Sequence, residues 1–238
     1  MRTLAVFVLG LSVASAQELT VGGRFSLPLT RAFDPSQGTL SLAQPLSGSR
    51  SYDSEGQRLV AGPAMNVFFR RTRGLGIEIG ALHQRLRFNG KEVQFIPIAP
   101  GVEGSRGRSW STSASVWEFP LLLKYRIPAG AFRPYIVAGP SLSRVFDIGQ
   151  SLECFDFVSP CRRGSPAGEP LELRRRAFLG LAIGAGVEFN RKHLVSFAPE
   201  VRYVHYGARH FEEPSGLIRS GDRRLLLMVG VNLGSRIP

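Results

Sequence analysis

The chain of 238 residues has little cysteine, few acidic residues and no long apolar run, and the first and last of these shortages exclude classes of protein. Its two cysteines do not form a CxxC pair, and no cluster of histidine and cysteine has the spacing of a zinc site. No apolar run approaches the roughly 18 residues that a membrane-spanning helix needs. We therefore expect no metal ion, no cofactor and no helical transmembrane fold.

The shortage of acidic residues leaves a formal net charge of +12, which can indicate a nucleic-acid partner. The distribution of charge argues against that partner. Four long polar segments, at 28–56, 89–113, 147–176 and 207–222, are each close to neutral, and no basic stripe is interleaved with aromatic residues. We expect no nucleic acid to bind, and we assign the excess charge to short turns, strand ends and the protein interior.

The N-terminus has the pattern of a secretory signal. Arg2 supplies the positive charge, residues 4–13 the apolar segment, and residues 14–16 a small-residue cleavage site. The apolar segment is too short to cross a bilayer as a helix, although a short N-terminal anchor is an alternative. We predict a signal peptide at 1–16 and a single domain at 17–238, because barrels and sandwiches of this size are commonly undivided.

Cys154 and Cys161 lie close together in a polar segment. An exported chain meets an oxidising compartment, so the spacing predicts a local structural disulfide. Two free thiols are the alternative interpretation.

Apolar and polar residues alternate with a period of two in eight segments, which predicts eight strands. Two of them form a hairpin within 117–143 that turns at 128–130, and its first arm, 117–127, has the clearest alternation. The other six segments are 19–27, 57–69, 75–88, 177–189, 194–206 and 223–234. The connections alternate strictly between long and short. That alternation favours a transmembrane barrel, with short periplasmic turns and long outer loops, over a soluble sandwich.

The two faces of these strands differ in a way that fits a barrel in a membrane. One face is broad, apolar and tipped with aromatic residues, as expected where strands meet lipid. The other combines small residues with charges. Eight strands leave an interior just wide enough for side chains, and unpaired charges there would be costly. We predict a filled lumen with a charge network made by Glu78, Glu118, Lys124, Arg126, Glu188, Glu200 and Arg202.

Two stretches of the hairpin, EFPLLLKY at 118–125 and RPYIVAGPSL at 133–142, carry a family resemblance. They resemble the outer membrane protein beta-barrel, or porin-family, domain of Gram-negative bacteria, which includes OmpX-like and OmpA-membrane-domain-like barrels. The resemblance implies an all-β, eight-stranded antiparallel transmembrane β-barrel with four long outer loops and three short periplasmic turns. It also implies a monomer in the outer membrane, in contact with membrane lipids and, during biogenesis, with the outer-membrane assembly machinery.

Two groups of residues are candidates for a site. The arginines at 174–176 could contact lipopolysaccharide phosphates, because guanidinium groups suit them, or could be solvated and paired with Glu169 and Glu172. The four histidines are His83, His193, His205 and His210. A lipid-modifying enzyme would need one of them beside a serine or aspartate at the rim.

The sequence therefore favours a non-enzymatic barrel with a side-chain-filled lumen, whose long loops serve envelope structure or surface interaction. A small passive pore for ions or solutes is the alternative. A lipid-modifying enzyme and a soluble secreted β-barrel binder, with its apolar faces turned inward, are the remaining hypotheses.

Overall fold

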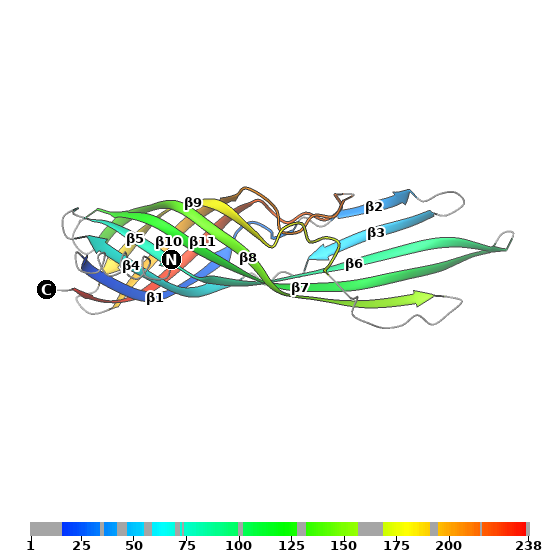
Figure 1. Cartoon of the computed structure of the whole chain (residues 1–238), viewed down its shortest axis with the longest axis horizontal. Coiled ribbons are helices and arrows are strands. Elements are labelled where there is room, and N and C mark those ends of the chain that lie inside the picture. The colour runs from blue at the N-terminus through cyan, green and yellow to red at the C-terminus, as the bar shows by residue number, and fades with distance from the viewer. Residues whose placement is uncertain are drawn as a thin grey trace, which may run out of the picture.

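The computed structural model describes residues 16–33, 36–41, 47–54, 59–69, 72, 74–99, 102–127, 132–156, 169–190, 195–214 and 216–236. The predicted signal peptide lies outside these residues except for Ala16. The described chain forms one elongated sheet of eleven strands (Figure 1). They are β1 (Ala16–Pro28), β2 (Ser36–Ser41), β3 (Ser47–Ser54), β4 (Val60–Phe69), β5 (Leu75–Gly80), β6 (Leu82–Ala99), β7 (Val102–Arg126), β8 (Phe132–Asp156), β9 (Ala177–Asn190), β10 (Val195–Tyr206) and β11 (Arg223–Arg236).

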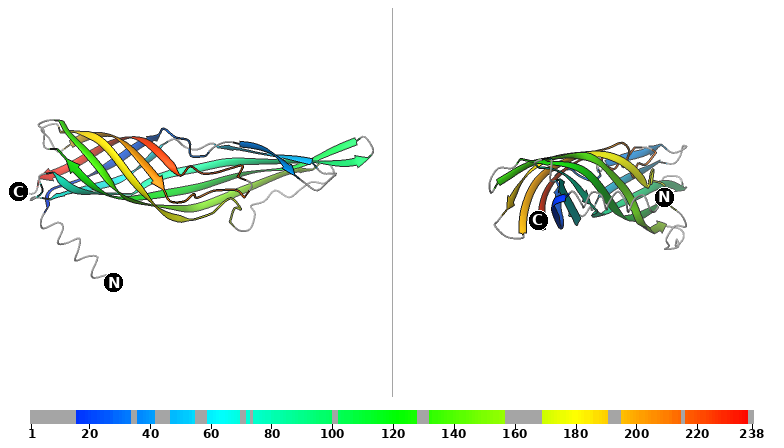
Figure 2. Two further views of the ribbon diagram at one scale, coloured as in Figure 1. Left: turned by 90° about the horizontal axis from the view of Figure 1, so that it is seen from above. Right: turned by 60° about the vertical axis from the view of Figure 1, so that its left-hand side comes forward.

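Eight of these strands close into a ring. They pair in the order β1, β11, β10, β9, β8, β7, β5 and β4, and β4 pairs again with β1. Every pairing is antiparallel, and Val21 of β1 faces both Leu233 of β11 and Met65 of β4. The predicted eight-stranded antiparallel barrel is therefore confirmed. The turned view in Figure 2 shows the strands curving around the interior.

The four long connections are present, but three of them contain strands that the sequence pattern did not indicate. Residues 89–113 are a paired hairpin rather than a loop, with Asn89 opposite Ser111 and Ala99 opposite Val102. The connection after β1 contains the β2–β3 hairpin, which joins the same sheet through β6. β8 also continues to Asp156. These parts form an extension beyond one end of the ring, opposite the end where the chain terminates (Figure 1).

The extension escaped prediction because apolar and polar residues do not alternate regularly along it: β2, β3 and residues 103–113 are mostly polar, and residues 93–99 of β6 are mostly apolar. Alternation reveals a strand only where one face is apolar. The segment predicted as one strand at 75–88 is also divided, since β5 ends at Gly80 and β6 begins at Leu82. At this division Gly80 lies beside Pro120 of β7, whose ring leaves no backbone N–H to donate.

The apolar residues of the ring face outward and the charged residues face inward. Leu179, Leu181 and Ile183 of β9 are each about 60% exposed or more, whereas Glu188 and Arg202 are almost fully buried. Aromatic residues predicted for the lipid border, among them Phe119, Tyr125, Phe189 and Tyr203, are also exposed. A soluble binder requires the opposite arrangement of faces.

Candidate functional site: the filled lumen and the outer mouth

The centre of the lumen is organised around Glu78 of β5. Its Oε2 accepts a hydrogen bond from Arg24 Nη2 at 2.7 Å, and its Oε1 accepts one from Arg202 Nη2 at 2.6 Å. Lys124 Nζ lies 3.6 Å from the same carboxylate. All four side chains are at most 2% exposed. One buried carboxylate thus joins cations from β1, β7 and β10.

A second carboxylate and several neutral groups complete this network. Glu200 Oε1 accepts from Arg202 Nε at 2.5 Å, and Tyr135 donates its hydroxyl to Glu200 Oε2 at 3.0 Å. Lys124 Nζ lies 4.0 Å from the centre of the Tyr135 ring and donates to Asn66 Oδ1. Three cations therefore meet two carboxylates, and the remaining positive charge is stabilised by a ring face and an amide oxygen.

Two further parts of the interior hold the other predicted residues. Towards the short turns, Arg126 lies 2.7 Å from Glu18 and 3.4 Å from Glu188. Farther out, Glu118 accepts hydrogen bonds from Ser141 Oγ at 2.7 Å and from the Tyr206 hydroxyl at 2.8 Å. The structure thus places all seven predicted residues in the interior. It groups Glu78, Lys124, Glu200 and Arg202 together, Arg126 with Glu188, and Glu118 apart with hydroxyl partners.

Sequence reasoning omitted Arg24, which is 1% exposed and central to the network. Its position on the polar face of the first strand was the available signal. Gly230 of β11 makes room for it, because a Cβ at this position would lie 2.2 Å from Arg24 Nη1. Asn232 Oδ1 then accepts from the same nitrogen at 2.6 Å.

Apolar layers separate and cover the charged groups. Leu82, Leu122, Val204 and Leu226, each at most 1% exposed, belong to one buried cluster inside the ring. A second cluster lies at the outer mouth, where the ring centres of Phe33, Phe88 and Phe211 are 5.2 to 5.9 Å apart. Phe33 and Phe211 come from outer connections. The mouth is therefore covered by side chains that the connections supply.

An ion cluster lies beyond this apolar cover, in the extension. Arg50 of β3 is 2.6 Å from both Glu92 of β6 and Glu213, and Arg108 of β7 is 3.0 Å from Glu92. Burial would raise the pKa of Glu92, but hydrogen bonds from Arg50 and Arg108 outweigh it and lower the pKa below its ordinary value. The cluster ties the connection at 207–222 to the extended sheet.

A serine–histidine pair lies at the outer mouth. Ser143 Oγ of β8 is 2.8 Å from His210 Nε2, and His210 Nδ1 is 2.9 Å from the carbonyl oxygen of Arg175. A carbonyl only accepts, so Nδ1 carries the proton and Nε2 accepts from the serine. Burial, together with the charge of Arg224, lowers the pKa of His210 to about 4. Both side chains are at most 6% exposed, and His210 packs on Phe178.

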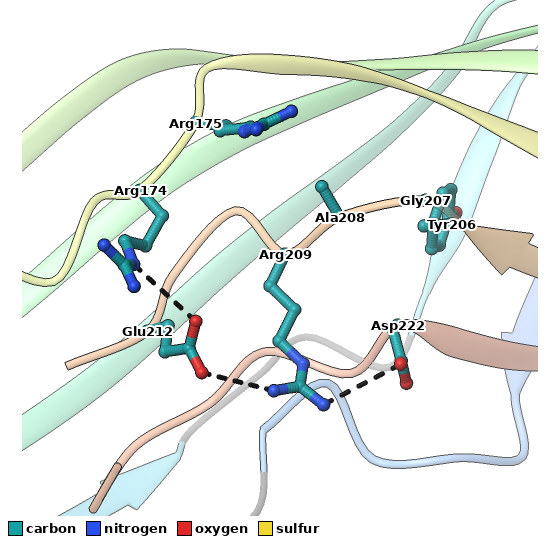
Figure 3. Close-up of a pocket in the computed structure, with 8 residues that line it drawn as sticks. All are labelled: Arg174, Arg175, Tyr206, Gly207, Ala208, Arg209, Glu212 and Asp222. Atoms are coloured by element: carbon teal, nitrogen blue, oxygen red, sulfur yellow. Dashed lines mark hydrogen bonds and ion pairs between the residues drawn. The ribbon is translucent and has the colours of Figure 1, made fainter. Parts of the chain in front are cut away.

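A pocket of about 500 Å³ lies beside this pair and is lined by residues of the outer connections (Figure 3). Arg209 bridges Glu212 at 3.3 Å and Asp222 at 3.7 Å, and Arg174 approaches Glu212 at 3.6 Å. Arg176 pairs with Glu169 at 2.5 Å. Arg174 and Arg176 of the arginine run are therefore paired with carboxylates, although Glu172 instead accepts from Trp110 Nε1 at 3.0 Å.

Other predicted features fall partly outside the described residues. Cys154 is in β8, but Cys161 is outside the described part of the chain, so the disulfide stays a prediction. His193 is also outside it. Within the described ranges, no three histidine, cysteine, aspartate or glutamate residues are grouped to hold a metal ion. In the same ranges, no helix has the length and apolar character needed to cross a membrane.

A closed antiparallel ring with an apolar outer face and a filled, charged interior defines a transmembrane β-barrel. Comparison with known proteins agrees. The family model of the outer membrane protein beta-barrel domain matches residues 15–207, so the chain belongs to this family. The protein accordingly resides in the bacterial outer membrane, where its apolar face contacts lipid.

Two solved structures illustrate the likeness. The outer membrane protein OprG from Pseudomonas aeruginosa has a TM-score of 0.53 at 15% identity, covering 94% of this chain and 98% of that chain. Neisserial surface protein A has a TM-score of 0.41 at 13% identity, covering 90% and 96%. The likeness to OprG concerns the fold alone. No curated protein sequence matches the chain.

Replacing Glu78 by glutamine should destabilise the barrel strongly. The substitution keeps the shape of the side chain but leaves Arg24 and Arg202 without their shared carboxylate, a change that costs about 3–5 kcal/mol for buried pairs. Urea unfolding in detergent micelles measures the change. Glu169→Gln is the matched control, because its partner Arg176 is half exposed and surface pairs contribute about 1 kcal/mol or less. Equal effects of the two substitutions would contradict the assigned role of Glu78.

The connection at 207–222 should loosen as the pH falls from about 6.5 towards 4. The folded pKa of His210 lies below its ordinary value, so its contribution is fully present above the unfolded pKa. It is lost on acidification, because the unfolded chain takes up a proton that the folded chain does not. The shift corresponds to about 3 kcal/mol.

Amide hydrogen exchange of residues 207–222, corrected for intrinsic rates, measures this loosening. His210→Asn should remove the dependence between pH 6.5 and about 4, whereas His205→Asn, at an exposed position of β10, should leave it unchanged. A dependence that survives in His210→Asn would assign the effect to another group.

Proposed function

We propose that the protein is a non-enzymatic outer-membrane barrel with a closed lumen, which presents its outer extension as a surface for interaction or envelope structure. The observation that best supports this proposal is that β6, β7 and β8 continue as one paired sheet past the ring. Residues 89–99 alone reach about 35 Å at the usual rise per residue of a strand. A paired sheet holds its outer end in a defined position, whereas an irregular loop would not.

The filled interior supports a closed rather than a conducting barrel. The Glu78 network, the apolar layer around Leu122 and the aromatic cover around Phe211 follow one another along the lumen. An ion would have to displace all three. A small passive pore remains the alternative, because side chains in a lumen can rearrange.

The Ser143–His210 pair is the observation that favours the enzyme hypothesis. The histidine is oriented to accept the serine proton, as in nucleophilic catalysis. However, both side chains are buried, and neither lines the pocket of Figure 3. We therefore assign the pair to holding the connection at 207–222 against β8.

The proposed partners follow from the location. Export by the signal peptide at 1–16 and insertion by the outer-membrane assembly machinery would bring a monomeric barrel into the membrane. Lipopolysaccharide would then surround its outer rim. Arg174 and Arg176 are less suited to its phosphates than the sequence indicated, because each already faces a carboxylate.

Planar-bilayer recordings should show no steady channels from the wild-type protein. Phe33→Ala/Phe211→Ala should also stay silent, because the substitutions remove the outer cover but leave the Glu78 network and the Leu122 layer. Steady openings of nanosiemens size from the wild type would overturn the closed lumen. Openings from the double variant alone would place the closure in the outer cover.

Removing the end of the extension should abolish function while the barrel still folds. Replacing residues 94–106 by a short turn leaves the ring pairings intact, since Val93 and Gly107 face each other across the β6–β7 ladder and would flank the new turn. Heat-modifiable migration in detergent gels checks folding. Cells lacking the protein, complemented with either form, are then compared for surface binding and detergent resistance. Full complementation by the shortened form would place the function outside the extension.

A further inference from the structure

A polar hollow of about 590 Å³ lies on the outward face of the sheet where the ring meets the extension. Its lining is Arg85 and Arg87 of β6, Ser111 and Ser113 of β7, and Gly149, Gln150 and Ser151 of β8. Strand register brings these residues together. Arg87 faces Ser113, which faces Gly149, and Ser111 faces Ser151. Two guanidinium groups and three hydroxyls therefore share one face, and none of the described lining residues is acidic.

The two arginines present donors to this hollow. Arg87 Nε donates to Ser111 Oγ at 3.1 Å, which holds its guanidinium group beside the serines. Arg85 forms no ion pair with any residue that the structure describes, and it is exposed. The side chain of Gln150 is used elsewhere, since its Nε2 donates to Thr112. Planar guanidinium groups with neighbouring hydroxyls match the geometry of a phosphate.

Local backbone geometry keeps the hollow open. The β7–β8 register shifts between Ser113 and Ser115, and Asp147 nearby has a φ of 47°. Such a bulge changes the direction of the strand. Gly149 adds space because it has no side chain. A Cβ at this position would meet only Ser113 Oγ at 3.6 Å, an ordinary contact. A side chain would therefore fit at position 149. Because glycine has none, the space is left open for a ligand.

The hollow begins directly beyond the aromatic border of the lipid-facing band. Trp117 faces His83 across β6 and β7, with ring centres 5.0 Å apart, and its other neighbour is Phe119 at 6.3 Å. The next outward row on this face is Arg85 opposite Ser115. Aromatic girdles mark the membrane–water interface, so the arginines are at the level of lipid headgroups.

We propose that this hollow binds a phosphate group of an outer-leaflet glycolipid. The height of the hollow, just above the aromatic border, favours a lipid headgroup over a soluble phosphate. Two acidic residues lie near the hollow without lining it: Asp147 is exposed in the bulge of β8, and Glu153 is farther from the membrane, opposite Ser109. The site is independent of whether the lumen conducts and of what the extension contacts.

The test uses the full mature barrel in phosphatidylcholine nanodiscs, titrated with diphosphoryl lipid A, with lipid A stripped of its phosphates, and with inorganic phosphate. Native mass spectrometry measures the bound fraction. The wild type should prefer diphosphoryl lipid A to both other probes. Arg85→Gln/Arg87→Gln should weaken that binding by about tenfold or more for each charge-assisted hydrogen bond that the substitutions remove. Gly149→Val should weaken it by filling the hollow while keeping both charges.

Arg223→Gln is the matched control, since Arg223 is an exposed arginine of β11, four strands away from β7 in the ring. It should bind lipid A as the wild type does, and heat-modifiable migration confirms that each variant folds. Equal binding of the two lipid A forms would overturn the site. So would equally weakened binding in Arg223→Gln and the double variant. Inorganic phosphate bound as tightly as lipid A would overturn the assignment to a lipid.

Discussion

A ring of eight strands encloses a space that only side chains can fill, and the rest of the structure depends on this constraint. Charges within such a space are stable only when paired. Arg24, Lys124 and Arg202 come from three strands and meet at Glu78. A slip of any one strand by one residue would turn its charge to the lipid and leave its partners unpaired. The network therefore specifies the register of the barrel as well as filling it.

The inward residues of β7 show how the filling changes along the lumen. From the short-turn end outward they are Arg126, Lys124, Leu122, Pro120 and Glu118, followed by Val116, Ala114, Thr112 and Trp110. Charge gives way to an apolar layer, then to a carboxylate held by hydroxyls, and finally to the aromatic cover. The charged groups among these residues have partners on other strands: Arg126 meets Glu18 and Glu188, Lys124 meets Glu78, and Glu118 accepts from Ser141 and Tyr206.

Much of the ring could be predicted from the sequence because one physical rule, alternation, governs every strand that separates lipid from lumen. Glu118, Lys124 and Glu200 could be assigned to the interior from the alternation alone, because they lie on the polar face of their strands. The partners could not be assigned in this way, because Arg24 meets Glu78 only through ring closure, and Glu118 turned out to bind Ser141 and Tyr206. The Ser143–His210 pair joins residues far apart in the chain. Much of the extension, including β2, β3 and residues 103–113 of β7, has few apolar residues, so alternation gave no clear signal there.

The arginines of the outer surface have two kinds of surroundings. In the pocket of Figure 3, Arg174 and Arg209 face carboxylates of the same chain, so their charge is already balanced. At the hollow between β6 and β8, serines take the place of carboxylates around Arg85 and Arg87. Headgroup phosphates are the anions available at that height, and a carboxylate in the lining would repel them. The lining thus has the composition that the proposed phosphate site requires, with two arginines and three serines and no acidic residue among the described lining residues.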